Sequence, residues 1–228
     1  EDGSSSSDPC TIATIPWSTI ETELESEDVY VQFKRGDTFG QLSVLDYGTY
    51  TKDDSYRLYI QDYSTGDKPS FEVNDPDWYY VIRQYRIPNV TYKNLEIRNL
   101  YTSGATTGQG LYFDDAGNGG NNFNGGIHVI DCDFYWMGHY AIAFTRMGDY
   151  NIVQGCTFNY CGNGAYFINE TGTSGSDYNY AGYNTCTHVN WSTDNNYNSG
   201  YDGHCIVFQS GSYNVCEHNT ATNTRFPF

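Results

Sequence analysis

Hydrophobic and polar residues alternate in short runs that recur along the second half of the chain, with one bend-prone residue between two runs. Aligned on that residue, five segments of eight residues keep mostly apolar or cysteine side chains at their third, sixth and eighth positions. The segments are residues 90–97, 127–134, 151–158, 184–191 and 214–221. Asn, Asp and Gly tolerate the left-handed backbone of a sharp bend, so each segment is predicted to be two strands joined by a bend. The bend residues are Asn94, Asp131, Gly155, His188 and His218.

A second set of apolar strands keeps step with these repeats. They are residues 110–114, 141–145, 165–169 and 205–209. Two inward columns are expected from them, namely Leu111, Ile142, Tyr166 and Ile206, and Phe113, Phe144, Ile168 and Phe208. Similar units recurring at 24 to 37 residues, without a helical stripe, indicate a β-solenoid that pairs with itself in parallel one coil later. A β-sandwich with accidental alternation is the alternative.

The repeats resemble the right-handed parallel β-helix family, the pectate-lyase-like superfamily. The strings FKRGDTF and GDKPSF, followed by NVTYKNLEIRN, are similar to the opening of many secreted bacterial-type β-helix proteins. This resemblance implies an all-β, right-handed parallel β-helix and a link to extracellular polysaccharides. It reports the fold far better than the chemistry.

The ends of the chain differ in character. Residues 1–10 form a low-complexity tail, and residues 11–228 are expected to form one β-helix domain. The sequence Ser18-Thr19-Ile20-Glu21 has the capping-box pattern and predicts a short helix that covers the first coil. Only residues 222–228 follow the last repeat, which is too short for a second cap. Either the given chain is a truncated form or another chain covers that end.

The composition limits the partners. A net charge of −17 disfavours nucleic acid and anionic membrane surfaces, and it disfavours polyanionic sugars unless a metal intervenes. No apolar run is long enough to span a membrane. With 23 tyrosines and 24 glycines, the surface is predicted to be rich in aromatic hydroxyls, which suits contact with sugars or with another protein.

Cysteines and glycosylation sequons favour an extracellular location. Cys132 and Cys156 are expected to share one column, and Cys186 and Cys216 another. Each pair is either a disulfide or two stacked thiols of the core. Glycosylation sequons begin at Asn89, Asn169 and Asn190, and these features together are typical of secreted proteins.

The candidates for chemistry are weak. The acidic candidates for catalysis, joined by one histidine, are Asp114, Asp115, Asp131, Asp133, Asp202 and His204. A β-helix polygalacturonase-like hydrolase would carry further motifs, and most of them are missing here. Asp114, Asp115, Asp131 and Asp133 could form a calcium site. The pair His188 and His218 could bind a metal, but a stacked turn position explains both histidines better.

Two functions from different classes follow. The first is a secreted, non-catalytic β-helix subunit that assembles head-to-tail with copies of itself into an extracellular filament or array, without a cofactor. The second is a polysaccharide lyase or glycoside hydrolase, or a fragment of one. A lyase needs a basic residue, and Lys and Arg are sparse in the later repeats. A sugar-binding adhesin that uses tyrosine-rich loops is a third possibility.

Overall fold

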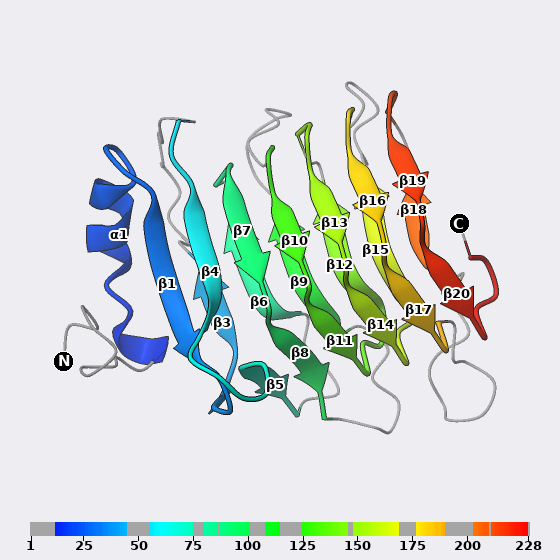
Figure 1. The fold of residues 1–228 in the computed structure, drawn as a ribbon, viewed down its shortest axis with the longest axis horizontal. Helices are drawn as coiled ribbons and strands as arrows, with labels where there is room; N and C mark the ends of the chain where they lie inside the picture. Colours follow the sequence, from blue (N-terminus) through cyan, green and yellow to red (C-terminus); the bar gives the residue numbers. More distant parts are fainter. Residues whose placement is uncertain are drawn as a thin grey trace.

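The protein is a right-handed parallel β-helix of three sheets with one short helix at its N-terminal end (Figure 1). The structure is a computed structural model. It describes residues 12–44, 55–74, 80–85, 87–100, 108–114, 125–145, 148–168, 177–189, 203–209 and 211–227. The predicted tail, residues 1–10, lies outside these ranges. No helix among the described residues is long and apolar enough to cross a membrane.

Each sheet runs along the solenoid and takes one strand from successive coils. The first sheet contains β1 (Val29–Lys34), β4 (Leu58–Tyr63), β7 (Val90–Lys93), β10 (His128–Ile130), β13 (Ile152–Gln154), β16 (Tyr180–Gly182) and β19 (Val215–Glu217). The second contains β2 (Thr38–Phe39), β5 (Ser70–Val73), β8 (Glu96–Asn99), β11 (Asp133–Tyr135), β14 (Thr157–Asn159), β17 (Thr185–Thr187) and β20 (Thr220–Thr222). The third contains β3 (Leu42–Val44), β6 (Tyr80–Tyr85), β9 (Gln109–Asp114), β12 (Tyr140–Thr145), β15 (Asn163–Ile168) and β18 (Ile206–Phe208).

Left-handed residues form the corners between the sheets. The corner between the first and second sheets holds Asn94, Asp131, Gly155, Tyr183 and His218, all with φ between 53° and 67°. Four of these five are the predicted bend residues. The corner after the second sheet holds Trp136, Tyr160, His188 and Asn223, with φ between 54° and 63°. Sharp bends at fixed positions let short strands stack coil on coil.

The predicted register of the fourth repeat is wrong. Val153 pairs with Ala181, and Ala181 pairs with Cys216, so the coil begins at Asn179 rather than at Asn184. Cys186 therefore lies in the eighth column, between Phe158 and Ala221. The predicted columns of Cys186 with Cys216 and of His188 with His218 do not exist.

Asparagine side chains fix this register. The Oδ1 atom of Asn179 accepts the backbone N–H of Asn151 at 2.9 Å, and that of Asn214 accepts the N–H of Asn179 at 2.9 Å. One bend later, the Oδ1 atom of Asn184 accepts the N–H of Cys156 at 2.9 Å. Each amide thus bonds a backbone group that a bend removes from the sheet. Two asparagines five residues apart are consequently the mark of a coil.

One strand of the third sheet is also shifted by one residue from the prediction. Ala165 pairs with Ile142, and Phe167 pairs with Phe144. Both are buried, whereas Tyr166 is only half-buried. A slip of one residue exchanges the two faces of a strand. This register places Phe167 in the inward phenylalanine column and Tyr166 on the outer side of the sheet.

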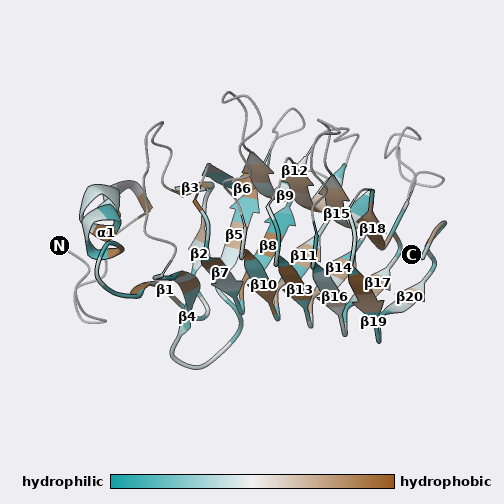
Figure 2. Cartoon of the chain, turned by 90° about the horizontal axis from the view of Figure 1, so that it is seen from above, coloured by the Kyte–Doolittle hydropathy of each residue, from teal (hydrophilic) through white to brown (hydrophobic). Residues whose placement is uncertain are grey.

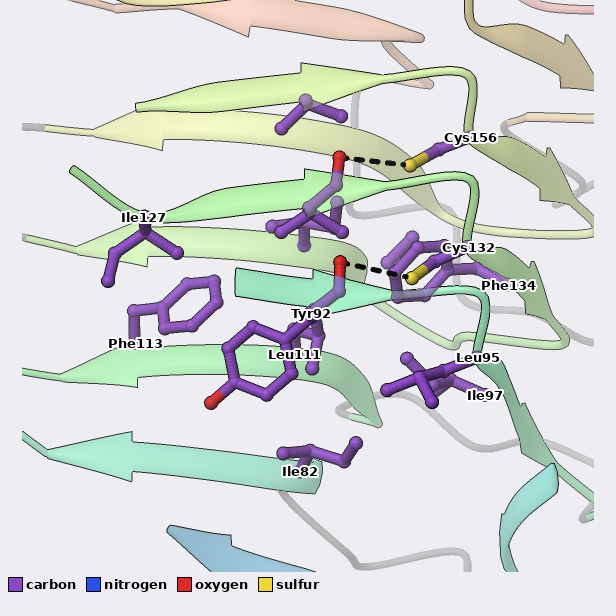
Figure 3. Packing of buried hydrophobic residues seen from close by; sticks show 14 of the residues in the cluster. Ile82, Tyr92, Leu95, Ile97, Leu111, Phe113, Ile127, Cys132, Phe134 and Cys156 are labelled. Carbon is purple, nitrogen blue, oxygen red and sulfur yellow. Dashed lines mark hydrogen bonds between the residues drawn. The ribbon is translucent and has the colours of Figure 1, made fainter. Parts of the chain in front are cut away.

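The core is a set of columns, of which one in the first sheet and one in the second end in small side chains at the last coil, whereas the phenylalanine column of the third sheet does not narrow. The third position of the repeat runs from Tyr92 through Val129, Val153 and Ala181 to Cys216. The eighth runs from Ile97 through Phe134, Phe158 and Cys186 to Ala221. Figure 3 shows the wide part of this core, where Cys132 and Cys156 point inward from successive coils. Exposing the last coil to water therefore costs less than exposing an earlier one would.

The structure contains both free, buried thiols and a disulfide, but the disulfide does not join either of the predicted pairs. Cys132 and Cys156 are free, buried thiols, and their Sγ atoms lie near the carbonyl oxygens of Tyr92 and Val129 at 3.7 and 3.5 Å. The disulfide joins Cys186 to Cys205. Cys216 is a free, exposed thiol. The disulfide thus ties β17 to the segment that leads into β18.

The N-terminal helix, α1 (Trp17–Glu23), follows a single 3₁₀ turn, η1 (Ile12–Thr14). It lies beside β1 in Figure 1 and places the buried side chains of Ile20 and Leu24 on the hydrophobic core. This confirms the predicted helix but not its capping box. Its N-cap is Pro16, with no side-chain hydrogen bond. Ser18 lies inside the helix, where its carbonyl accepts the hydroxyl of Thr22 at 3.0 Å.

Candidate binding surfaces

Among the candidate catalytic aspartates, Asp131 and Asp133 are the two whose side chains are described, and both residues contact Lys68. The Nζ atom of Lys68 lies 2.7 Å from an Asp133 carboxylate oxygen and donates to the Asp131 carbonyl at 2.6 Å. The Asp131 side chain covers the backbone of Gly155 at the next corner. These contacts give both residues a structural role at and beside the corner between the first and second sheets.

Of the other predicted catalytic residues, only His204 is fully described. Asp114 lies in β9, but its side chain is outside the described set, as are Asp115 and Asp202. His204 stacks on Phe226 at 4.9 Å, and its backbone N–H donates to the Asn163 side chain at 3.0 Å. Within the described ranges, no group of three His, Cys, Asp or Glu residues could hold a metal ion.

The two histidines predicted as a pair lie at different corners. His188 stacks on Tyr160 at 4.7 Å, and its Nε2 atom lies 3.1 Å from the Asn223 amide. His218 stacks on Tyr183 at 4.9 Å. The metal-binding interpretation of this pair is therefore wrong, because the two rings belong to separate aromatic columns.

Of the three sequon asparagines, only Asn89 is described. It occupies a left-handed corner with φ of 54°, is half-buried, and turns its side-chain oxygen toward Gly126. Thr91 of the same sequon is buried and accepts a hydrogen bond from Arg57 at 3.2 Å. Asn169 and Asn190 lie outside the described residues.

The buried thiols are poor nucleophiles. Burial raises the pKa of the Cys132 and Cys161 thiols to about 12 and that of Cys156 well above its usual range. Since the thiolate is the reactive species, these side chains fill the core.

Basic side chains gather on the outer side of the first sheet, a feature that the sequence analysis missed. Arg57 and Lys93 supply the positive charge of this cationic face, and the half-buried imidazole of His128 lies on the same side of the sheet. Arg57 is partly buried and donates to the Gly126 carbonyl at 2.8 Å. Thr91, which Arg57 contacts, pairs in register with Tyr59 and His128. Tyr59 stacks on the exposed Tyr30 at 4.6 Å. A cationic and aromatic surface on a chain of net charge −17 is suited to an acidic, flat ligand.

Acid is expected to destabilise the protein through His128. Burial, and secondarily the charge of Arg57, lower the pKa of His128 to about 4. Because this pKa is below that of the unfolded chain, the unfolded state binds more protons in acid. Stability is therefore complete above about pH 6.5 and falls as the pH decreases through the unfolded pKa toward the folded one.

Urea unfolding between about pH 7 and pH 4 tests this expectation. His128→Gln should flatten the pH dependence of stability, whereas Gln154→Asn, at an exposed site of the same sheet, should leave it unchanged. Burial lowers the pKa of His139 to about 3, and this residue is present in both variants. Part of the pH dependence of stability should therefore remain in both. An equal slope in wild type and His128→Gln would contradict the assignment.

The last coil forms an open end, defined as described residues 203–209 and 211–227. The strands β18, β19 and β20 are the last of their sheets. One further bridge joins His204 to Phe226, and otherwise no described strand continues the stack. Large side chains are exposed here, with Tyr213 at 73%, Val215 at 45% and Phe226 at 41%. Figure 2 shows hydrophobic colour on β18 and β19 at this end.

The opposite end of the solenoid is covered and acidic. The acidic end, residues 17–28, comprises α1 and the turn that follows it. It carries five carboxylates and no Lys or Arg; these are Glu21, Glu23, Glu25, Glu27 and Asp28. In the described residues of the open end, Glu217 and Arg225 are the charged side chains and balance one another. The two ends therefore differ in both charge and coverage.

Comparison with protein-family models, with curated proteins and with solved structures found no match. The fold and the geometry of the side chains therefore carry the functional argument.

Proposed function

We propose that the protein is a secreted, non-catalytic β-helix subunit whose open end binds the acidic end of the next copy. One observation carries this proposal: β19 and β20 each pair with a described strand on one side only, and the exposed side chains of Tyr213 and Val215 lie beside them. An edge strand presents unpaired backbone groups and is a ready surface for association. A contact between two different surfaces does not close on itself, so it propagates into a filament.

Charge favours the head-to-tail arrangement over a contact between two open ends. A chain of charge −17 repels its copies, and this repulsion is least where Glu217 and Arg225 balance. Arg225 and the imidazole of His218 would face the carboxylates of the acidic end. The helix α1 covers β1, so the contact joins strands of one copy to the helical cap of the next. The disulfide Cys186–Cys205 supports an extracellular location, since disulfides persist in oxidising compartments.

Sedimentation velocity over a range of protein concentrations tests the contact. The wild type should form larger species as the concentration rises. Ala221→Glu, at the uncovered end of a core column, should shift this association to higher concentration. Gln154→Glu adds the same charge to an exposed site in the middle of the first sheet and should leave association unchanged. A wild type that stays monomeric throughout would overturn the proposal.

A charge exchange distinguishes the arrangements. Arg225→Glu should weaken association several-fold, as expected for charges at the rim of an interface. Adding Glu23→Arg and Glu25→Arg should restore it if the contact is head-to-tail. Loss without restoration would indicate that two open ends meet instead, which gives closed dimers.

The cationic face favours a second candidate, binding of an acidic polysaccharide. The resemblance to the pectate-lyase-like superfamily points to the same substrate class, with lyase or hydrolase activity as its extension. Calorimetry should then show affinity for acidic but not neutral oligosaccharides, with a loss in Lys93→Gln and none in Lys34→Gln. Release of unsaturated products would extend this to a lyase, and absence of binding to either class would remove the candidate.

A further inference from the structure

Threonines form a regular array on the outer side of the second sheet, near the open end. In register, Thr157 pairs with Thr185 and Thr185 with Thr220. Two residues further along the same strands, Asn159 pairs with Thr187 and Thr187 with Thr222. The threonine array is therefore two rows of three side chains on β14, β17 and β20. It comprises Thr157, Asn159, Thr185, Thr187, Thr220 and Thr222.

The array is uncharged, unlike the rest of the same sheet. The row that begins with Thr157 continues toward the N-terminus through Asp133 and Glu96. There Lys68 binds Asp133 and Arg98 binds Glu96. Among the described contacts of the array, no side-chain hydrogen bond engages the five threonine hydroxyls. The Asn159 side-chain oxygen also lacks a hydrogen-bond partner in the described part of the chain, but it is buried. The exposed hydroxyls of Thr185, Thr220 and Thr222 are the groups available to a ligand.

The spacing of the array is set by the backbone. Neighbouring strands lie about 4.8 Å apart, and alternate residues of one strand about 6.6 Å apart. Threonine has few rotamers because it is branched at Cβ, so each methyl and hydroxyl pair is held in place. The result is a stiff two-dimensional lattice of alternating apolar and hydrogen-bonding groups. Such a lattice matches a ligand that itself repeats in two dimensions, such as the surface of a crystalline solid, better than it matches a single flexible molecule.

The composition of the array narrows the ligand. The absence of charge in the array, on a chain of net charge −17, disfavours a mineral or a polyelectrolyte. The array contains no aromatic ring for a sugar to stack on. Water in hexagonal ice is uncharged, has both donors and acceptors, and repeats along its two principal directions at distances comparable to those of the array. Ordered water between the threonines would then belong to both lattices.

We propose that the threonine array is an ice-binding surface, whose ligand is the ordered water at the face of an ice crystal. The array faces sideways from the solenoid and extends to Thr220 and Thr222 on β20, so it adjoins the contact proposed at the open end. Preorganised side chains need lose little entropy on binding. Their fit to a repeating surface improves with each additional coil that carries the same pair.

The test is the growth of single ice crystals in the presence of the purified chain, together with inhibition of ice recrystallisation. The wild type should shape the crystals and depress the growth temperature below the melting temperature. Thr187→Lys, at the centre of the array, should abolish most of this depression. Gln154→Lys, with the same new charge on the first sheet, should retain it. Circular dichroism and thermal melts establish that both variants fold.

Each other outcome overturns the proposal. If the wild type does not affect ice growth, the protein does not bind ice. If Thr187→Lys and Gln154→Lys lose the effect equally, the threonine array is not the ice-binding surface. Binding to crystalline cellulose or chitin in a pull-down, without any effect on ice, identifies the array as a surface for a solid polysaccharide. The concentration series by sedimentation is independent of all three results, so failure here leaves the proposed assembly to its own test.

Discussion

Replacing Phe158 with alanine is expected to lower the free energy of unfolding by about 3–5 kcal/mol. Phe158 is fully buried and stacks on Phe134, with ring centroids 5.4 Å apart. In register it lies between Phe134 and Cys186. The β-sheet backbone on either side prevents the coils from collapsing into the space that the ring leaves, so the substitution creates a cavity and removes a stacking contact.

Tyr178→Ala is the matched control, because it removes a stacked aromatic ring from an exposed corner. Tyr178 stacks on Tyr150 and Tyr213 at 5.3 and 5.0 Å, yet it remains about half exposed. Its loss should cost about 1 kcal/mol or less. Urea unfolding followed by tyrosine fluorescence measures both variants. Equal losses of unfolding free energy in Phe158→Ala and Tyr178→Ala would contradict the assignment of Phe158 to the core and of Tyr178 to an exposed corner.

Removing the disulfide is expected to have the second largest effect, a loss of about 3 kcal/mol. The bridge joins Cys186 to Cys205 across a sequence separation of 19 residues. It restricts the unfolded chain, and in the folded state it holds β17 to the segment that leads into β18 within one coil. Unfolding of the Cys186→Ala, Cys205→Ala double variant measures the loss. Reducing the wild type should give a similar loss while both sulfur atoms remain in place.

Cys216→Ser is the control for this experiment. Cys216 is free and exposed on the last coil, so its replacement should change the free energy of unfolding by less than about 0.5 kcal/mol. A loss in Cys216→Ser as large as in the double variant would indicate that Cys216 forms the bridge, as the register inferred from the sequence had suggested.

Most of the fold follows from the alternation of residues around the corners. The first three repeats and the last have the register that the sequence predicts, because Asn94, Asp131, Gly155 and His218 adopt the left-handed backbone. The fourth repeat was misplaced because its cysteine was aligned with the cysteine of the last. Asn179 and Asn184 are the better guide. An amide can bond the backbone of the preceding coil at a bend, whereas a cysteine can occupy any inward column.

The binding surfaces were harder to predict, since they depend on which coils lie side by side. Arg57 and His128 are far apart in sequence and come together because Tyr59, Thr91 and His128 share one row of the first sheet. The threonine array was hidden for the same reason. Thr185 and Thr187 belong to it only in the register that begins at Asn179. A shift of five residues in this coil would disperse the threonine array.

The small side chains at the last positions of two core columns are consistent with the proposed association. The columns that contain Tyr92 and Ile97 end with Cys216 and Ala221. Small or polar side chains at the open end lower the cost of exposing it before a partner binds. Phe208 and Phe226 leave some apolar surface there for contact. Such an end suits a subunit that is stable alone and that associates as its concentration rises.

Backbone hydrogen exchange at several protein concentrations tests the central claim most directly. The amides of β19 and β20 lie at the edge of the stack, where few contacts slow their exchange. If the open end binds another copy, their protection must rise with concentration, while that of β13 and β14 in the middle of the solenoid stays constant. Protection of β19 and β20 that is independent of concentration, over a range in which the wild type is otherwise folded, would contradict the account.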